Sequence, residues 1–278
     1  RGPFPGAARL AEMNFIVQGY PAYAYTGGRA FDPGLPAVVL LHGAALDHSV
    51  WHYPARYLAH HGFSVLAVDL PGHGRSPGAL RTSVEALADW VAAFVEAACV
   101  GRAHVVGHSL GSLVALATAI AHPARVARLG LLGVSAPMPV GEAFLAAAKD
   151  DSPAAFDMQT AWGHARNVAL AASAIPGVSL AGASRRLVGR ARPGVQHADL
   201  AACHAYAPDA AAIRAIAAPA LVVAGRRDQM TPWKAGQAVA GLVPGATLVT
   251  LDCGHAMTTE APGAVTAALH RHLAAGGR

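Results

Sequence analysis

The strongest local signal in this sequence is the stretch Gly107-His108-Ser109-Leu110-Gly111. It follows an apolar run, Ala103–Val106, with the length and composition of a buried strand, and it opens a helical pattern over Leu110–Ala121. A serine at such a strand-to-helix turn stands clear of the sheet, and glycines two residues before and after it permit the sharp bend and its close packing. The stretch therefore predicts a nucleophilic serine, Ser109.

Short β-branched or leucine-rich runs alternate with longer helical patterns along most of the chain. The runs that predict further buried strands are Ala37–Leu41, Ser64–Asp69, Arg128–Leu132, Ala220–Ala224 and Thr247–Leu251. The helical patterns between them cover Val84–Ala98, Lys234–Leu242 and Pro262–Leu273. Right-handed crossovers would place these helices on both faces of a parallel sheet, so the predicted fold class is α/β, with a doubly wound, mostly parallel sheet. The segment Met13–Tyr25 is expected to add an antiparallel pair at one edge.

The regular alternation stops after Leu132 and resumes at Ala220. From Ser135 to Ala218 the sequence shows helical patches and Pro/Gly punctuation but no clear strand. A connection of this length is uncommon in a compact domain unless it is functional or carries its own structure. We therefore expect residues 135–218 to form an inserted helical cap over the carboxyl ends of the strands, with residues 1–134 and 219–278 forming the core.

A serine hydroxyl becomes a good nucleophile only when a base accepts its proton. The helix that begins at Leu110 directs its free N–H groups and positive dipole end toward the charge that develops in acyl transfer. The backbone N–H of Leu110 is therefore the predicted first oxyanion donor. The alternative, a Gly-Ser-Gly turn without chemistry, fits the strand–turn–helix setting less well.

Several motifs in order give nearly the whole chain a family resemblance. From His42-Gly43 to the segment around His255, it resembles the α/β-hydrolase fold superfamily, and specifically its serine-nucleophile, esterase- and lipase-like members. The segment Leu41-His42-Gly43-Ala44, with Trp51 downstream, resembles the oxyanion loop of that family. The resemblance implies that the Ala44 backbone N–H is the second oxyanion donor.

A second loop carries the same resemblance. Asp69-Leu70-Pro71-Gly72-His73-Gly74-Arg75-Ser76 is similar to the family's loop after the next strand. His42 and His73 are then interpreted as structural loop residues rather than bases. Asp69 is likewise expected to be structural, because polar groups at strand ends mostly satisfy nearby backbone donors.

The acid and the base should follow the nucleophile in the order Ser, Asp, His, each on a loop at the carboxyl end of a strand. Ala220–Ala224 ends in Gly225-Arg226-Arg227-Asp228, which resembles the family's acid loop, and Asp228 would hold the productive histidine tautomer. Thr247–Leu251 ends in Asp252-Cys253-Gly254-His255, which resembles the catalytic-histidine loop. Ser109, Asp228 and His255 are therefore the predicted nucleophile, acid and base.

Asp252 is a rival acid. It lies so near His255 in sequence that it could not easily reach the far ring nitrogen from a tight turn. The family sometimes carries its acid after the preceding strand, but Leu131–Pro139 offers no carboxylate. These observations favour Asp228.

Composition and charge narrow the possible partners. The chain has 278 residues, of which 54% are hydrophobic, so it can bury a large core as one domain with an insertion. No apolar run reaches the roughly 18 to 20 residues needed to span a bilayer. The net charge of +5 comes from 21 Lys and Arg spread along the chain, without the clustered basic stripe of a nucleic-acid surface. We expect neither a membrane span nor a nucleic-acid partner.

Three widely separated cysteines, Cys99, Cys203 and Cys253, form neither a disulfide framework nor a zinc pattern, which favours the cytoplasm. The start of the chain shows no signal-peptide pattern. One denser group of cations could bind a carboxylate or phosphate on a substrate, although such a run is usually a solvated face. Its members are Arg185, Arg186, Arg190 and Arg192.

No cofactor or metal is expected. Fifteen histidines include the short spacings His48/His52 and His270/His272, but neither pair is joined by a zinc-type set of carboxylates or cysteines. Gly72-His73-Gly74 lacks the third glycine and the acidic partner of a dinucleotide fingerprint.

The predicted function is a serine hydrolase that cleaves a carboxylic ester or related acyl substrate through an acyl-enzyme intermediate. Carbon–carbon bond hydrolases, lactonases, cofactor-free perhydrolases and acyltransferases are the alternatives within the same family, and a slow-turnover ligand receptor is a further one. The cap residues predicted to line the pocket for this small-molecule substrate are Phe144, Phe156, Met158 and Trp162. The sequence makes no prediction of oligomeric state.

Overall fold

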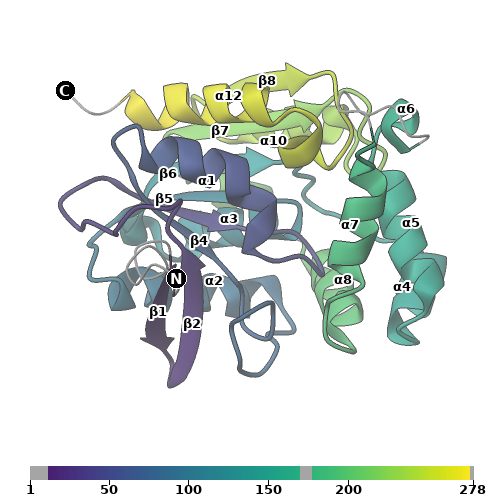
Figure 1. The fold of residues 1–278 in the computed structure, drawn as a ribbon. Coiled ribbons are helices and arrows are strands. Elements are labelled where there is room, and N and C mark those ends of the chain that lie inside the picture. Colours follow the sequence, from purple (N-terminus) through teal and green to yellow (C-terminus); the bar gives the residue numbers. More distant parts are fainter. Residues whose placement is uncertain (1–11, 170–176, 276–278) are drawn as a thin grey trace.

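The protein forms one mixed sheet with helices on both faces in a computed structural model that describes residues 12–169 and 177–275 (Figure 1). The sheet order is β1-β2-β4-β3-β5-β6-β7-β8. The pairs β1/β2 and β2/β4 are antiparallel, and all other neighbouring pairs are parallel. The strands are β1 Glu12–Val17, β2 Tyr20–Tyr25, β3 Ala37–Leu41, β4 Ser64–Val68, β5 Ala103–His108, β6 Val126–Leu132, β7 Ala220–Gly225 and β8 Thr247–Leu251. The predicted fold class is confirmed, including the antiparallel pair at the edge.

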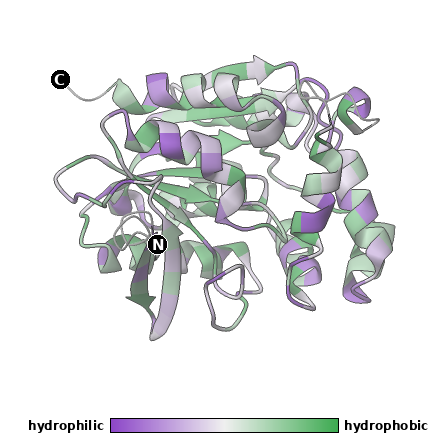
Figure 2. Cartoon of the chain, in the orientation of Figure 1, coloured by the Kyte–Doolittle hydropathy of each residue, from purple (hydrophilic) through white to green (hydrophobic). Residues whose placement is uncertain are grey.

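Two hydrophobic clusters lie on opposite faces of the sheet. One joins the sheet to α2, α3 and α10, and the other joins it to α1 and α12. Figure 2 shows hydrophobic residues concentrated in the central strands, as expected for parallel strands covered on both faces. These helices are α1 His52–Ala59, α2 Val84–Ala97, α3 Leu110–Ala121, α10 Trp233–Leu242 and α12 Pro262–Ala274.

Most core elements begin and end within two residues of their predicted bounds, and α3 matches the predicted range. Helix α1, which was not predicted from the sequence, follows a 3₁₀ turn at His48–Trp51. This helix is short and buries only Pro54, Ala55, Leu58 and Ala59, so its apolar periodicity is too brief to distinguish it from a loop.

The connection between β6 and β7 is helical in its described residues. Its elements are α4 Glu142–Lys149, α5 Pro153–Gly163, α6 Arg166–Ala169, α7 Leu180–Val188, α8 Val195–Ala205 and α9 Ala210–Arg214. In Figure 1, α4, α5, α7 and α8 lie together beyond the end of the sheet toward which the arrow of β8 points. The short α9 instead contacts the core helices α3 and α10. An inserted helical cap is therefore present, while its division from the core at residues 135 and 218 stays a prediction.

A smaller helix, α11 Met257–Glu260, follows β8 and precedes α12. No helix of the described ranges 12–169 and 177–275 is both long enough and apolar enough to cross a membrane.

The turn between β5 and α3 depends on two glycines. A Cβ on Gly107 would lie 1.8 Å from the carbonyl oxygen of Gly111, and a Cβ on Gly111 would lie 2.4 Å from the carbonyl oxygen of Leu41. Both obstructions are backbone atoms, which cannot move aside like the end of a side chain. The absence of side chains at these positions lets α3 pack directly against β3 and β5.

This contact predicts that Gly107→Ala lowers the free energy of unfolding by about 3 kcal/mol or more, the upper part of the range for overpacking. Gly241→Ala is the matched control, because Gly241 lies in α10 with no atom within 4 Å of its added Cβ. In a helix that exchange stabilises by up to about 1 kcal/mol. Denaturant unfolding of both variants measures the difference, and equal stability of the two would show that the close approach is absent.

Candidate active site

Ser109 lies at the turn between β5 and α3 in a strained conformation. Its φ of 55° and ψ of −121° are unusual for a residue with a side chain. Its N–H donates to the carbonyl of Leu132 at the end of the neighbouring strand β6, at 2.9 Å. The carbonyl of Ser109 accepts from the backbone N–H of Ser112 at 2.8 Å. The turn is therefore held from both sides, and it brings Ser109 to the wall of a cavity.

His255 and Asp228 meet at the same end of the sheet. His255 Nδ1 lies 2.8 Å from Asp228 Oδ2, although the two residues follow different strands, β8 and β7. The other carboxylate oxygen, Oδ1, accepts from the backbone N–H groups of Met230 and Thr231, each at 2.8 Å. The Thr231 hydroxyl donates to Oδ2 at 2.7 Å. Asp228 is thus oriented by its own loop and binds the inner nitrogen of His255.

The electrostatics of the pair favour an ionised Asp228. Burial alone would raise the pKa of this carboxyl, but the charge and hydrogen bond of His255 and the hydrogen bonds from Thr231 outweigh it and hold the pKa below its ordinary value. A carboxylate at Nδ1 keeps the proton on that nitrogen, so His255 Nε2 is left as the basic atom. Within the described residues, Nε2 is buried without a hydrogen-bond partner.

His108, the residue before Ser109, packs against the candidate base. The two imidazole rings are 4.8 Å apart, and His108 Nε2 lies 2.8 Å from the carbonyl oxygen of His255. Burial, reinforced by the neighbouring His255, lowers the pKa of His108 to about 3. His108 is therefore neutral at ordinary pH and links the turn at Ser109 to the loop that carries His255.

The rival carboxylate, Asp252, is engaged elsewhere. Its two oxygens accept from Nε and Nη2 of Arg227, both at 2.7 Å. The pair is largely exposed, and within the described residues no hydrogen bond or ion pair joins Asp252 to His255. Of the two carboxylates, Asp228 is the one within hydrogen-bond distance of His255.

The two amides expected to bind an oxyanion flank Ser109. Leu110 is the first residue of α3, so its N–H has no acceptor within the helix. The loop that carries Ala44 runs close to the serine, since a Cβ on the preceding Gly43 would lie 3.2 Å from Cβ of Ser109. The carbonyl of Ala44 accepts from Gln159 Nε2 at 2.8 Å, which ties this loop to α5.

The residues interpreted as structural make local contacts. His42 lies with Nδ1 2.9 Å from the Gly43 carbonyl, and its Nε2 accepts from the N–H of Leu70 at 3.1 Å. Asp69 accepts from the backbone N–H groups of His48 at 2.7 Å and Arg75 at 2.8 Å. The hydrogen bonds of His42 and Asp69 therefore fix the backbone of the neighbouring loops.

His73 is also held, by a partner that the sequence did not indicate. Its Nε2 lies 2.8 Å from Oδ2 of Asp199, a buried residue of α8. The same oxygen accepts from the N–H of Ala45 at 2.8 Å. Asp199 therefore ties α8 of the cap to the loop after β3, a contact across 126 residues that no local motif predicts.

Asp47, His48 and Asp69 bring three potential metal ligands within 4.8 Å of one another. At least one atom of each residue already has a protein partner: Asp69 Oδ1 binds both the N–H and Nδ1 of His48, and Asp47 Oδ1 binds Ser49. Hydrogen bonding explains this group.

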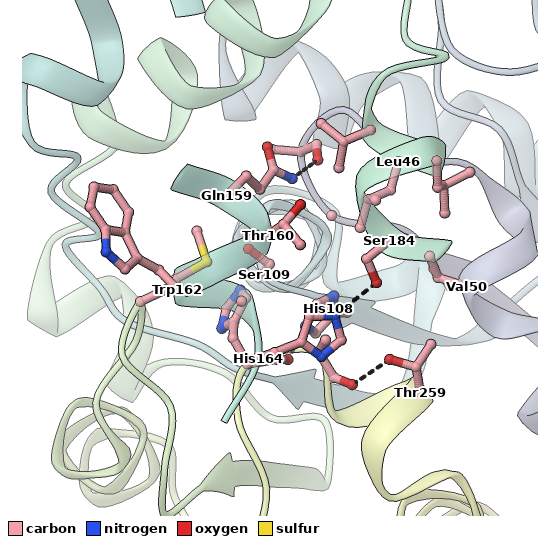
Figure 3. Close-up of a pocket in the computed structure, with 18 of the residues that line it drawn as sticks. Leu46, Val50, His108, Ser109, Gln159, Thr160, Trp162, His164, Ser184 and Thr259 are labelled. Carbon is pink, nitrogen blue, oxygen red and sulfur yellow. Dashed lines mark hydrogen bonds between the residues drawn. The ribbon is translucent and has the colours of Figure 1, made fainter. Parts of the chain in front are cut away.

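Ser109 and His255 both line a cavity of about 830 Å³ between the core and the inserted helices. Figure 3 shows Ser109, Gln159, Thr160 and Trp162 around this space. Phe144 and Trp162, two of the four predicted pocket residues, line it, and their rings meet edge to face with centroids 5.5 Å apart.

The other two pocket predictions need correction, because Phe156 and Met158 are not among the lining residues. Both lie on α5, whose last turn carries the residues that face the cavity. Met158 packs against the hydrophobic cluster of the core, and the ring of Phe156 lies beside Gly189. Residue type alone could not distinguish these faces of one helix.

A series of hydrogen-bonded polar side chains beside the cavity was not predicted from the sequence. His164 Nε2 lies 2.9 Å from the hydroxyl of Ser184 on α7, a contact visible in Figure 3. His164 Nδ1 lies 3.0 Å from Oε1 of Glu260. Glu260 Oε2 accepts from the N–H of Gly254, the residue before His255, at 2.8 Å. Burial raises the pKa of Glu260, but the hydrogen bonds from His164, Gly254 and Ala165 outweigh it and lower the pKa overall.

Comparison with known proteins identifies the family to which the chain belongs. The family model for the alpha/beta hydrolase fold matches residues 36–262. The chain belongs to the alpha/beta hydrolase family. The resemblance inferred from the motifs is thereby confirmed, and with it membership of a family of hydrolases.

Among curated relatives, a pimeloyl-[acyl-carrier protein] methyl ester esterase of Methylococcus capsulatus is 31% identical over 246 residues, covering 78% of this chain and 86% of that protein. Three other relatives match over shorter segments, which cover 28%, 35% and 37% of their respective lengths. The chain thus spans well under half the length of those three relatives.

Solved structures agree with the fold. The enol-lactonase of Burkholderia xenovorans LB400 superposes with a TM-score of 0.83 at 21% identity, covering 94% of this chain and 99% of that one. A 2-hydroxy-6-oxo-6-phenylhexa-2,4-dienoate hydrolase of Rhodococcus sp. strain RHA1 gives a TM-score of 0.76 at 26% identity, covering 95% and 98%.

Substitution of Asp228 and of Asp252 tests which of these two carboxylates supports the base. Asp228→Asn should preserve the shape of the side chain but allow the wrong histidine tautomer, so we expect a loss of about 10⁴ in kcat for ester hydrolysis. Asp252→Asn removes only an exposed contact to Arg227 and should leave kcat within about twofold, because exposed ion pairs contribute little. Steady-state kinetics on one activated ester measure both. The reverse ranking would reassign the acid to Asp252.

Proposed function

We propose that this protein is a serine hydrolase that cleaves a carboxylic ester or related acyl substrate through an acyl-enzyme intermediate. The observation that carries the proposal is the 2.8 Å contact between Asp228 and His255 Nδ1, which leaves Nε2 without a partner in the described residues, in a histidine that lines the same cavity as Ser109. A base with this orientation beside a strained serine turn matches the requirements of nucleophilic acyl transfer.

The proposed reaction has two halves. His255 Nε2 takes the proton of the Ser109 hydroxyl as the oxygen attacks the substrate carbonyl, and the protonated histidine then gives that proton to the departing alcohol. Water enters next, loses a proton to His255 and attacks the acyl group, and Ser109 leaves with the proton returned. Asp228 remains ionised throughout and stabilises the imidazolium that forms in each half.

The negative charge on the carbonyl oxygen requires donors placed in advance. We assign this role to the backbone N–H groups of Ala44 and Leu110, which flank Ser109. Loss of a single oxyanion donor typically costs ~10² to 10³ in rate, so both loops must be in position for efficient turnover.

An ester is the favoured substrate because the relative with 31% identity over most of both chains is named as a methyl ester esterase. Phe144 and Trp162 are the proposed contacts for the acyl portion. Carbon–carbon bond cleavage is the second candidate, favoured by the neighbour named as a dienoate hydrolase at 26% identity. Lactonase and perhydrolase activities use the same triad and belong to this second group.

Ser184, His164 and Glu260 present a competing order of serine, histidine and carboxylate, of which Ser184 and His164 line the same cavity. Ser184 is the fifth residue of α7, and from this point the backbone N–H groups are used within the helix. Helix α7 therefore offers no free amide at Ser184 to stabilise an oxyanion. Ser109, at the beginning of α3, has this support.

A fluorophosphonate probe and an ester assay test the assignment together. Ser109→Ala should abolish labelling and reduce kcat by about 10⁶-fold, the loss typical of a removed nucleophile. Ser184→Ala is the matched control and should still be labelled at Ser109, with turnover retained. Circular dichroism and thermal unfolding confirm that both variants are folded.

Labelling that survives in Ser109→Ala but disappears in Ser184→Ala would transfer the role of nucleophile to the cap. Labelling at Ser109 without turnover on any ester would instead favour a ligand receptor over a hydrolase.

A further inference from the structure

Two members of the arginine group noted in the sequence face the candidate active site. Arg186, on α7, and Arg190, just after it, line the same cavity as Ser109 and His255. Their guanidinium groups are always charged and bind carboxylates through two parallel N–H donors. The arginine group is therefore divided between the cavity and the outer surface.

The permanently charged side chains that line this cavity are all positive. Among the described residues that line it there is neither an aspartate nor a glutamate. His108 carries no charge at ordinary pH, because burial lowers its pKa to about 3. The buried carboxylates nearby, Asp228 and Glu260, are each bound to a histidine. Arg186 and Arg190 are thus the permanently charged side chains among the described residues that line the cavity, and both are cations that can attract an anion.

The other two members of the group have partners outside the cavity. Arg185 forms an ion pair with Asp157, and Arg192 Nη2 donates to the carbonyl of Gly74 at 3.4 Å. Neither residue lines the cavity. Their roles are explained by the protein alone.

Arg186 and Arg190 have fewer contacts with protein acceptors. Arg190 lies 4.0 Å from the nearest oxygen of Asp47, and its side chain is 73% exposed. The other oxygen of Asp47 already accepts from the N–H of Ser49 at 2.9 Å. Arg186 is exposed, and no ion pair joins it to any carboxylate in the part of the chain that the structure describes. Both guanidinium groups are thus accessible to a ligand.

We propose that Arg186 and Arg190 form a binding subsite for a carboxylate at the far end of the substrate, so that the preferred substrate is an ester whose acyl chain ends in a free carboxylate. This inference rests on the proposed function for the ester group and adds the class of substrate. The apolar wall at Phe144 and Trp162 suits the methylene chain between the two ends.

Matched esters test this subsite. The 4-nitrophenyl half-esters of adipic and suberic acid are compared with 4-nitrophenyl hexanoate and octanoate, which have the same chain lengths but end in a methyl group. The quantity of interest is the ratio of kcat/KM for the half-ester to that for the neutral ester. We expect wild-type protein to favour a half-ester at one of the two lengths by about tenfold or more, as one charge-assisted hydrogen bond supports.

Substitution of single arginines tests which side chains cause the preference for the half-ester. In Arg186→Gln and Arg190→Gln, the ratio should fall by about tenfold in at least one variant, mainly through a higher KM for the half-ester. Arg185→Gln removes the same charge one residue away, from a side chain paired with Asp157, and should leave the ratio unchanged. The wild-type preference should also weaken at high salt.

A binding measurement keeps this inference separate from the proposed chemistry. Calorimetry with the monoamide of the favoured diacid, which lacks a scissile ester, should show binding that weakens in the same arginine variants. Arginine-dependent binding without turnover would support the subsite while overturning the esterase proposal. Turnover of neutral esters without any carboxylate preference would overturn the subsite alone.

Two further results would also overturn the carboxylate assignment. One is an equal fall of the ratio in Arg185→Gln, which would indicate general surface charge rather than a subsite. The other is tighter, arginine-dependent binding of an alkyl phosphate of matched length, which would assign the subsite to phosphate.

Discussion

The close approach of α3 to β5, through Gly107 and Gly111, is the constraint on which the remaining features depend. Because neither residue has a side chain, the helix begins directly at the end of the strand and lies against β3. The turn then forces Ser109 into a strained backbone conformation, with its N–H bound to the end of β6. The position of the serine, the start of the helix and its free N–H groups all follow from this one contact.

The inserted helices are tied to the loops that carry Asp228 and His255 by polar contacts rather than by packing alone. The carbonyl of Gly163 accepts from the N–H of Ala256 at 2.7 Å, and that of His164 accepts from Gln229 Nε2 at 3.3 Å. Glu260 completes the connection by binding both the His164–Ala165 turn and Gly254. Residues 163–165 therefore touch the loops that carry both Asp228 and His255. The position of the cap and the geometry of the proposed triad are linked.

The sequence predicted those parts of the protein that depend on local pattern. Strand and helix periodicity gave the sheet and most core helices, and the motifs around Ser109, Asp228 and His255 gave three positions that the structure places at one end of the sheet. Each of these loops follows a buried strand, and parallel strands end on the same side. Proximity in space thus follows from topology.

Residues that act through long-range contacts were not predictable in this way. Asp199 meets His73 across 126 residues, and His164 meets Glu260 across 96, with no motif to announce either pair. The wrong pocket assignments of Phe156 and Met158 have a related cause. The rotation of α5 about its own axis decides which side chains face the cavity, and composition carries no information about that rotation.

The proposed mechanism requires that Ser109 forms the acyl-enzyme. Its most direct test is a rapid acid quench of the wild-type protein during turnover of 4-nitrophenyl acetate, followed by mass spectrometry of the digested protein. We expect a stoichiometric burst of 4-nitrophenol and an acetyl group on the peptide that contains Ser109. An acetyl group on another residue, Ser184 above all, would contradict it.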